Sequence, residues 1–189
     1  QQSWFALLLS GGLFLLALLA KENAVTFLAV IPLSIYLFTN ASLKTTAVSV
    51  LPLLLSFGLY LLIRVNAVGY LYNPGLVVSG IMNDPYVETS VAEKYATITY
   101  TLGQYLKLLV FPHPLTHDYY PYQVPILNWV DWRVLVSLAA NLALLGWGIR
   151  SFRKRSIPPW SILFYFSTLS ILSNIVISVG APMNERFVY

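Results

Sequence analysis

Five long apolar stretches constrain this chain more than any other feature of its sequence. They run over residues 4–20, 23–39, 45–63, 132–149 and 157–179, and each is close to the ~17–25 residues that cross the hydrocarbon of a bilayer. Only 10% of the residues are charged, whereas a soluble domain carries roughly a quarter. Because backbone polar groups inside a bilayer must be paired within their own segment, the stretches predict helices. We therefore expect an all-α, polytopic transmembrane helix bundle and exclude a water-soluble enzyme.

The composition excludes several kinds of site. The chain has no cysteine, which removes disulfide scaffolds, zinc-thiolate sites, iron–sulfur clusters and cysteine nucleophiles. Its two histidines are too few for a histidine-built metal centre, so we predict no cofactor. The net charge of +4 does not predict nucleic-acid binding, because the basic residues form one dense cluster, at positions 150–155, between two apolar stretches. That placement is typical of a signal for membrane topology.

The basic cluster predicts which ends of the spans face the cytoplasm. Short loops rich in Lys and Arg stay on the cytoplasmic side, so residues 150–155 are placed there. Counting spans in both directions then places the turn at 40–44 in the cytoplasm. The pair Lys21-Glu22, the long segment 64–131 and residues 181–189 face outward.

The long outward segment, residues 64–131, contains five of the seven acidic residues and both histidines. Within it, residues 91–110 have the helical periodicity of an amphipathic helix lying in the membrane interface. The predicted apolar face consists of Val91, Tyr95, Ile98, Leu102, Tyr105, Leu106 and Leu109. The predicted polar face consists of Glu93, Thr97, Thr101, Gln104 and Lys107. The alternative is an ordinary membrane span lined with threonines.

Ionisable residues at the outer ends of the spans are candidates for a functional site, because a charge near hydrocarbon is costly unless it meets a cavity or a partner. Lys21 and Glu22 lie between two apolar stretches with almost no loop around them. Their other interpretation is a turn whose long side chains extend to water and pair locally. Arg64 ends the third stretch and can also be read as a membrane anchor.

Glu185 and Arg186 follow the fifth stretch, and adjacent residues of opposite charge cannot share one helix face. An arginine offers a forked donor suited to phosphate, and a glutamate can orient it or accept a hydrogen bond from a sugar hydroxyl. The alternative is a structural ion pair with Lys21 or Arg64.

A proline-rich loop at residues 111–121 presents His113, His117 and Asp118 as a group. Its three prolines favour an extended, stiff backbone. A metal site would need further ligands, so a divalent metal has no support here. A hydrogen-bonded loop that shapes the mouth of an active site is the preferred interpretation.

These outward charges suit an anionic lipid-linked substrate, whose phosphate stays among the headgroups while its polyprenyl tail stays in the bilayer. Transfer of its sugar needs positive charge to stabilise the departing phosphate and a carboxylate base for the acceptor. The competing function is a transporter or flippase for lipid-linked or anionic substrates, and a structural scaffold is a third. The predicted substrate-binding residues are Lys21, Glu22, Arg64, His117, Asp118, Glu185 and Arg186.

Four pieces of sequence, taken in order, resemble a known family. They are Leu-Leu-Ala-Lys-Glu-Asn at 18–23, Asn-Asp-Pro at 83–85, Leu-Val-Phe-Pro-His-Pro-Leu-Thr-His-Asp at 109–118, and Asn-Glu-Arg-Phe-Val-Tyr at 184–189. Together they resemble the membrane part of the TMTC-type, tetratricopeptide-repeat-bearing protein O-mannosyltransferase-like family, in its bacterial form. The similarity extends over nearly the whole chain, and the Lys-Glu and Glu-Arg-Phe pieces are its most specific parts.

The resemblance implies a GT-C glycosyltransferase fold in a bacterial inner membrane, with an extracytoplasmic active site, a polyprenyl-phosphate-sugar donor and a protein or other acceptor. The sugar would be a hexose such as mannose. Such families carry the catalytic carboxylate in their first outward loop. The sequence starts with an apolar run and ends after a charged pair, so we expect a fragment of one transmembrane domain. On that expectation the catalytic base and the tetratricopeptide repeats lie outside residues 1–189.

Overall fold

The computed structural model describes residues 3–69, 84–116, 119, 123–175 and 179–188. These residues form six α-helices and three short 3-10 helices, so the all-α prediction is confirmed. The chain divides into two compact units, and each is described by itself. Unit 1 contains the first three helices and residues 152–160. Unit 2 contains the fourth and fifth helices, the sixth helix from Ser161 onward, and the C-terminal segment.

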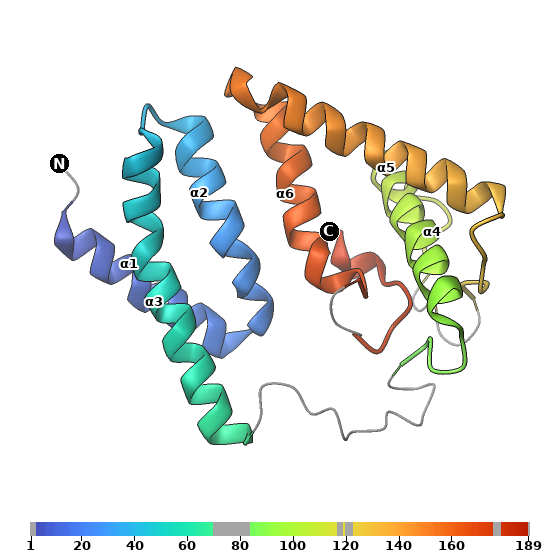
Figure 1. Ribbon diagram of the computed structural model, residues 1–189, viewed down its shortest axis with the longest axis horizontal. Helices are drawn as coiled ribbons and strands as arrows, with labels where there is room; N and C mark the ends of the chain where they lie inside the picture. Colours follow the sequence, from blue (N-terminus) through green and yellow to red (C-terminus); the bar gives the residue numbers. More distant parts are fainter. Residues whose placement is uncertain (1–2, 70–83, 117–118, 120–122, 176–178, 189) are drawn as a thin grey trace. The chain divides into compact units, whose positions relative to one another are not determined.

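Unit 1 is built from α1 (Trp4–Ala20), α2 (Phe27–Phe38) and α3 (Leu43–Val68). Helix α2 runs antiparallel to α3, and α1 crosses α3 obliquely (Figure 1). Gly11 lies buried at this crossing, where an added Cβ would come within 3.3 Å of Pro52. The hydroxyl of Ser56 donates to the carbonyl of Gly11 at 2.8 Å. A side chain at Gly11 would therefore push the two backbones apart.

Local sequence sets the ends of α3 and interrupts the second predicted span. The hydroxyl of Ser42 accepts the backbone N–H of Thr45 and caps α3, and Gly69 ends that helix with a φ of 87°, which glycine adopts readily. The predicted span 23–39 begins instead as a 3-10 helix, Glu22–Thr26, before α2. The sequence therefore predicted one continuous helix over 23–39, whereas the structure has a 3-10 helix up to Thr26 and an α-helix only from Phe27.

Unit 2 is built around α4 (Val91–Val110), which packs against α5 (Trp132–Ser151). The predicted bounds of α4 are confirmed. Its predicted polar face is wrong at Thr97 and Thr101, which are buried, whereas Lys107 is exposed. Hydrogen bonds explain their burial: the hydroxyl of Thr101 donates within its own helix, and that of Thr97 accepts the N–H of the distant Leu127 at 2.9 Å. The polar groups are thereby satisfied inside the unit.

The last helix, α6 (Ile157–Leu172), is shorter than the predicted span 157–179. Asn174 adopts a φ of 61°, a left-handed conformation that asparagine tolerates and that ends a helix. Its side chain accepts the N–H of Val179 and donates to the carbonyl of Ala181. This turn directs the chain into the C-terminal segment, which contains the 3-10 helix η3 (Glu185–Phe187).

Two helical segments among the described residues are long and apolar enough to cross a membrane. They are Leu43–Val68 and Trp132–Lys154, the latter being α5 with the 3-10 helix η2 (Phe152–Lys154). Three apolar helices are shorter, Trp4–Ala20, Glu22–Phe38 and Ile157–Leu172. Five spans thus remain a prediction, of which two have the required length.

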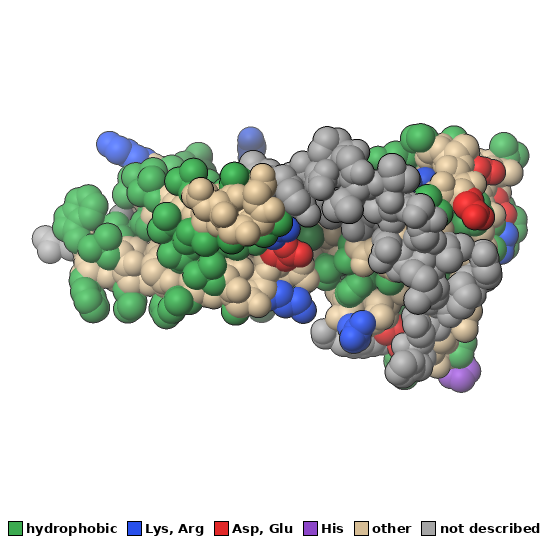
Figure 2. Space-filling view, turned by 90° about the horizontal axis from the view of Figure 1, so that it is seen from below, with side chains coloured by type: hydrophobic (Ala, Val, Ile, Leu, Met, Phe, Trp, Pro, Cys, Tyr) green, Lys and Arg blue, Asp and Glu red, His purple; other side chains and the backbone are tan. Residues whose placement is uncertain are grey.

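The outer surface of unit 1 is strongly apolar. Hydrophobic side chains cover most of its face in Figure 2, with few charges between them. Exposed large residues on α1 and α3 include Trp4, Phe5, Leu8, Leu16, Leu51, Leu55 and Leu62. Contiguous exposed apolar surface of this kind marks contact with membrane or protein, and it agrees with the hydropathy of the sequence.

Candidate functional site

The first group of predicted site residues lies where α1 ends. Lys21 has an extended backbone, with φ −155° and ψ 122°, and separates α1 from the 3-10 helix that starts at Glu22. The carboxylate of Glu22 forms a salt bridge of 2.5 Å with Nη1 of Arg64 on α3. The same nitrogen donates to the hydroxyl of Tyr60, one turn earlier on α3, at 2.9 Å. Glu22 therefore pairs with Arg64 and not with its neighbour Lys21.

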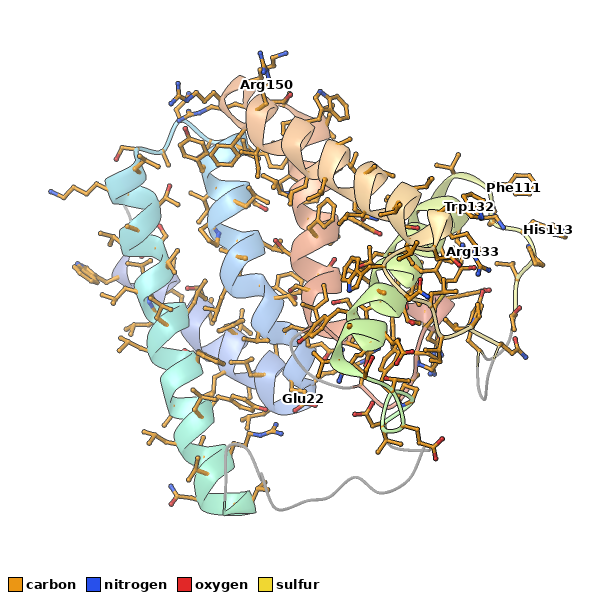
Figure 3. All side chains as sticks on the ribbon, turned by 45° about the vertical axis from the view of Figure 1, so that its right-hand side comes forward. Glu22, Phe111, His113, Trp132, Arg133 and Arg150 are labelled. Atoms are coloured by element: carbon orange, nitrogen blue, oxygen red, sulfur yellow. The ribbon has the colours of Figure 1, made fainter. Side chains whose placement is uncertain are left out.

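This group remains open to solvent. The side chains of Arg64 and Glu22 are 38% and 62% exposed, and Lys21 is exposed with no ion pair to any described residue. Figure 3 labels Glu22 where the chain passes from α1 towards α2. The arrangement thus presents one free ammonium and one guanidinium held by a carboxylate.

The second group lies in unit 2, in the segment around η3. Oε1 of Glu185 accepts two hydrogen bonds, from the backbone N–H of Thr116 at 2.7 Å and from the hydroxyl of Tyr119 at 2.8 Å. Both donors come from the proline-rich loop after α4. The loop therefore orients the carboxylate of Glu185, through Thr116 and Tyr119, a contact that the sequence did not predict.

Arg186 is positioned by the residue two places before it. Oδ1 of Asn184 accepts the backbone N–H of Arg186 at 3.0 Å and its side-chain Nε at 3.1 Å. Arg186 itself is exposed, and no described carboxylate forms a salt bridge with it. The guanidinium is therefore fixed at its base while its two terminal nitrogens have no described partner.

A buried layer supports the backbone that carries these two residues. Met183 and Tyr105 are each 1% exposed and belong to one apolar cluster with Leu108, Val124 and Leu169. The hydroxyl of Tyr105 accepts the N–H of Asn184 at 3.0 Å, and burial raises the pKa of this phenol above its ordinary value of 10. The hydroxyl therefore stays protonated and neutral at physiological pH.

Tyr86 holds the start of the same segment. Its buried hydroxyl donates to the carbonyl of Pro182 at 3.5 Å. The N–H of Tyr86 is itself bound by Asp84, whose carboxylate lies 3.9 Å from the ammonium of Lys94. The Asn-Asp-Pro piece of the sequence thus helps to position the C-terminal segment, although Asn83 lies outside the described residues.

The remaining predicted residues are not in the described part of this site. His117 and Asp118 lie outside the described residues. His113 is exposed, after the end of α4, and Figure 3 shows it pointing away from the helices. Among the described residues no three His, Asp or Glu side chains come together as a metal site would need.

The sequence did not predict the uncharged residues that position Glu185 and Arg186. Tyr119, Tyr105 and Asn184 carry no charge, so the cost of placing a charge near hydrocarbon does not single them out. Their position near the Glu-Arg pair depends on contacts over 66 to 79 positions of sequence, which no local pattern reveals.

Lys21, Glu22 and Arg64 are grouped in unit 1, and Glu185 and Arg186 in unit 2. The convergence of both groups on one substrate stays a prediction of the topology.

No protein-family model, no curated protein and no solved structure matches this chain.

Proposed function

We propose that this chain is part of a membrane glycosyltransferase of the GT-C type, which moves a hexose from a polyprenyl-phosphate donor to a protein or other acceptor on the extracytoplasmic face. The observation that carries the proposal is the Glu185-Arg186 pair. An oriented carboxylate stands next to a guanidinium that is fixed through Nε and has no salt bridge to a described residue.

The chemistry of a lipid-linked sugar phosphate fits this pair. The bond between the anomeric carbon and the phosphate oxygen breaks while the acceptor hydroxyl attacks that carbon and loses its proton to a base. Arg186 binds the departing phosphate through its terminal nitrogens, which gives a planar, two-point contact. Only Oε1 of Glu185 is engaged by described residues, so Oε2 accepts a hydrogen bond from the sugar.

Unit 1 supports the same substrate class. Arg64, held by Glu22 and Tyr60, and the free ammonium of Lys21 supply further positive charge at the end of α1. Apolar helix surface lies directly beside them, as a donor with a polyprenyl tail requires. We assign Lys21 and Arg64 to binding and orienting the donor.

The test is transfer of a radiolabelled hexose from polyprenyl phosphate by the purified full-length protein. Arg186→Ala should lower transfer roughly ten- to a hundredfold, because a hydrogen bond to a charged group is worth about 1.5–3 kcal/mol. The matched control is Arg150→Ala, which removes an exposed arginine near the end of α5 (Figure 3), in the basic cluster that the predicted topology places in the cytoplasm. Unchanged donor turnover and donor affinity in a folded Arg186→Ala protein would reject the assignment.

The competing transporter function gives a different result in the same preparation. In sealed vesicles a flippase moves the labelled lipid between leaflets without releasing the sugar to an acceptor. Movement without transfer would reject the transferase.

Orientation is tested separately. In this cysteine-free chain, single cysteines at positions 117 and 153 should react from opposite sides of the membrane. Labelling of both from one side would reject the predicted topology.

A further inference from the structure

The segment that follows α5 is fastened to the end of α2 within unit 1. The ring of Phe152 stacks on Tyr36, with centroids 4.9 Å apart and planes inclined by 10°. The guanidinium carbon of Arg155 lies 4.6 Å from the centroid of the same tyrosine, and its Nη1 donates to the carbonyl of Thr39 at 3.3 Å. Tyr36 therefore binds the segment at two points, and Arg155 also caps the end of α2.

A second attachment lies five residues further along. Nε1 of Trp160 donates to the hydroxyl of Ser34 at 2.9 Å, and its ring packs against Phe38 with centroids 5.5 Å apart. Residues 152–160 are thus held along the last turns of α2 by side chains at both ends of the segment.

Two cations lie between the first attachment points. Arg153 and Lys154 follow Phe152 and precede Arg155, both are exposed, and neither forms a salt bridge with a described residue. Within the described part of unit 1 the one acidic residue is Glu22, which precedes α2 and is paired with Arg64. The charge of Arg153 and Lys154 is therefore not neutralised within the described part of unit 1.

Exposed apolar side chains occur at the end of α2, at the start of α3 and at the start of α6. Phe38 is 52% exposed, Leu43 at the start of α3 is 72% exposed, and Ile157 at the start of α6 is 67% exposed. A soluble phosphate or a nucleic acid would leave these side chains in water, whereas a phospholipid covers them with its acyl chains while its phosphate meets the cations.

We propose that Arg153 and Lys154 bind the headgroup phosphate of an anionic phospholipid, whose acyl chains lie along Phe38, Leu43 and Ile157. The stack of Phe152 on Tyr36, together with Arg155, holds the two cations in place. Arg155 is a positioning residue, because its guanidinium is engaged by Tyr36 and Thr39. This lipid site is independent of the glycosyltransferase proposal.

The experiment compares retention of phosphatidylglycerol and phosphatidylcholine of identical acyl chains by the purified full-length protein, using native mass spectrometry. The wild type should prefer phosphatidylglycerol. Each cation near a membrane surface contributes about 1 kcal/mol, so Arg153→Gln should lower the preference about fivefold, and Arg153→Gln/Lys154→Gln should lower it further. Lys107→Gln, which removes an exposed lysine from α4, should leave it unchanged.

Two further measurements test whether the bound phosphate belongs to a lipid and whether Tyr36 positions the two cations. Excess inorganic phosphate at constant ionic strength should not displace phosphatidylglycerol, since it lacks the chains that cover the apolar side chains. Tyr36→Leu keeps every cation but removes the stack, and it should lower the preference. Equal retention of the two lipids by the wild type, an equal loss in Lys107→Gln, or displacement by inorganic phosphate would overturn the lipid site. An unchanged preference in Tyr36→Leu would overturn the positioning role.

Discussion

The hydroxyl of Tyr119 donates a hydrogen bond of 2.8 Å to Oε1 of Glu185, which lies 66 positions further along the chain. The same oxygen accepts the backbone N–H of Thr116 at 2.7 Å. Two donors on one oxygen fix the plane of the carboxylate more firmly than either alone. The proline-rich loop therefore has a defined role in unit 2, which is to orient the acidic member of the Glu185-Arg186 pair.

Replacing Tyr119 by phenylalanine removes one of these donors and keeps the ring. We expect transfer to fall roughly tenfold, because hydrogen bonds to charged groups are worth about 1.5–3 kcal/mol and the N–H of Thr116 remains. The measurement is kcat/KM for the lipid-linked hexose. Tyr95→Phe, at an exposed position of α4, is the control, and an equal loss in both variants would contradict the role of Tyr119.

Arg186→Lys keeps the charge but changes its shape. A lysine offers a point charge in place of the planar fork of arginine and cannot reproduce a two-point contact with phosphate. It also loses the Nε–H that donates to Asn184. We expect donor affinity to fall by about tenfold or more, measured by equilibrium binding of polyprenyl phosphate. Full affinity in Arg186→Lys, alongside a normal Arg150→Lys control, would show that charge alone suffices.

The Glu22–Arg64 pair should matter for the substrate more than for stability. Because the two side chains are 62% and 38% exposed, Glu22→Gln should change the free energy of unfolding by less than about 1 kcal/mol. The effect of Glu22→Gln on donor affinity should depend on Arg64, since the carboxylate of Glu22 acts by holding the guanidinium of Arg64. A double-mutant cycle with Arg64→Gln measures this coupling, and strictly additive losses in affinity would contradict it.

Local patterns predicted the helices well because each signal lies within one segment. The bounds of α1 and α4 were predicted correctly, because an apolar run followed by Lys21-Glu22 defines α1 and helical periodicity defines α4. The early end of α6 was missed because it depends on one left-handed asparagine, Asn174, whose side chain bonds to Val179 and Ala181. Such a conformation leaves no periodic signal in an apolar stretch.

The candidate site was predicted only in its charged members. Lys21, Glu22, Arg64, Glu185 and Arg186 stand out in an apolar chain because charges there are costly. Their partners could not be assigned, since any outward cation can pair with any outward carboxylate until the packing is known. Tertiary contacts also decided the fate of Thr97, which is buried by its bond to Leu127 although its side chain is polar.

The start of α4 should depend on pH through Glu93. Its carboxylate accepts the hydroxyl and the backbone N–H of Ser90, at 2.6 and 3.0 Å, and these bonds hold the pKa of Glu93 below its ordinary value of 4.5. A lowered folded-state pKa stabilises the fold above pH 4.5, and that contribution disappears as the pH falls through the lower value.

The melting temperature of Glu93→Ala should therefore lie below that of the wild type at neutral pH, with the difference shrinking in acid. Circular dichroism of the detergent-solubilised protein measures it. Glu88→Ala removes a nearby carboxylate that has no hydrogen bond to a described residue, so it should show no comparable effect. A difference for Glu93→Ala that stays constant into acid would contradict the capping role.

The crossing of α4 and α5 should tolerate no side chain at Gly103. A Cβ there would lie 2.5 Å from Cβ of Ser137, which is closer than real Cβ atoms approach, and 3.2 Å from its Cα. Overpacking of this kind costs about 1–3 kcal/mol, so Gly103→Ala should lower the melting temperature measurably. Gly146→Ala on α5 meets nothing within 4 Å and should be neutral or slightly stabilising, since alanine favours helices.

In a Ser137→Gly background the penalty of Gly103→Ala should shrink, because the obstructing atoms of the serine side chain are gone. An equal penalty in both backgrounds would mean that the two helices do not meet at these residues.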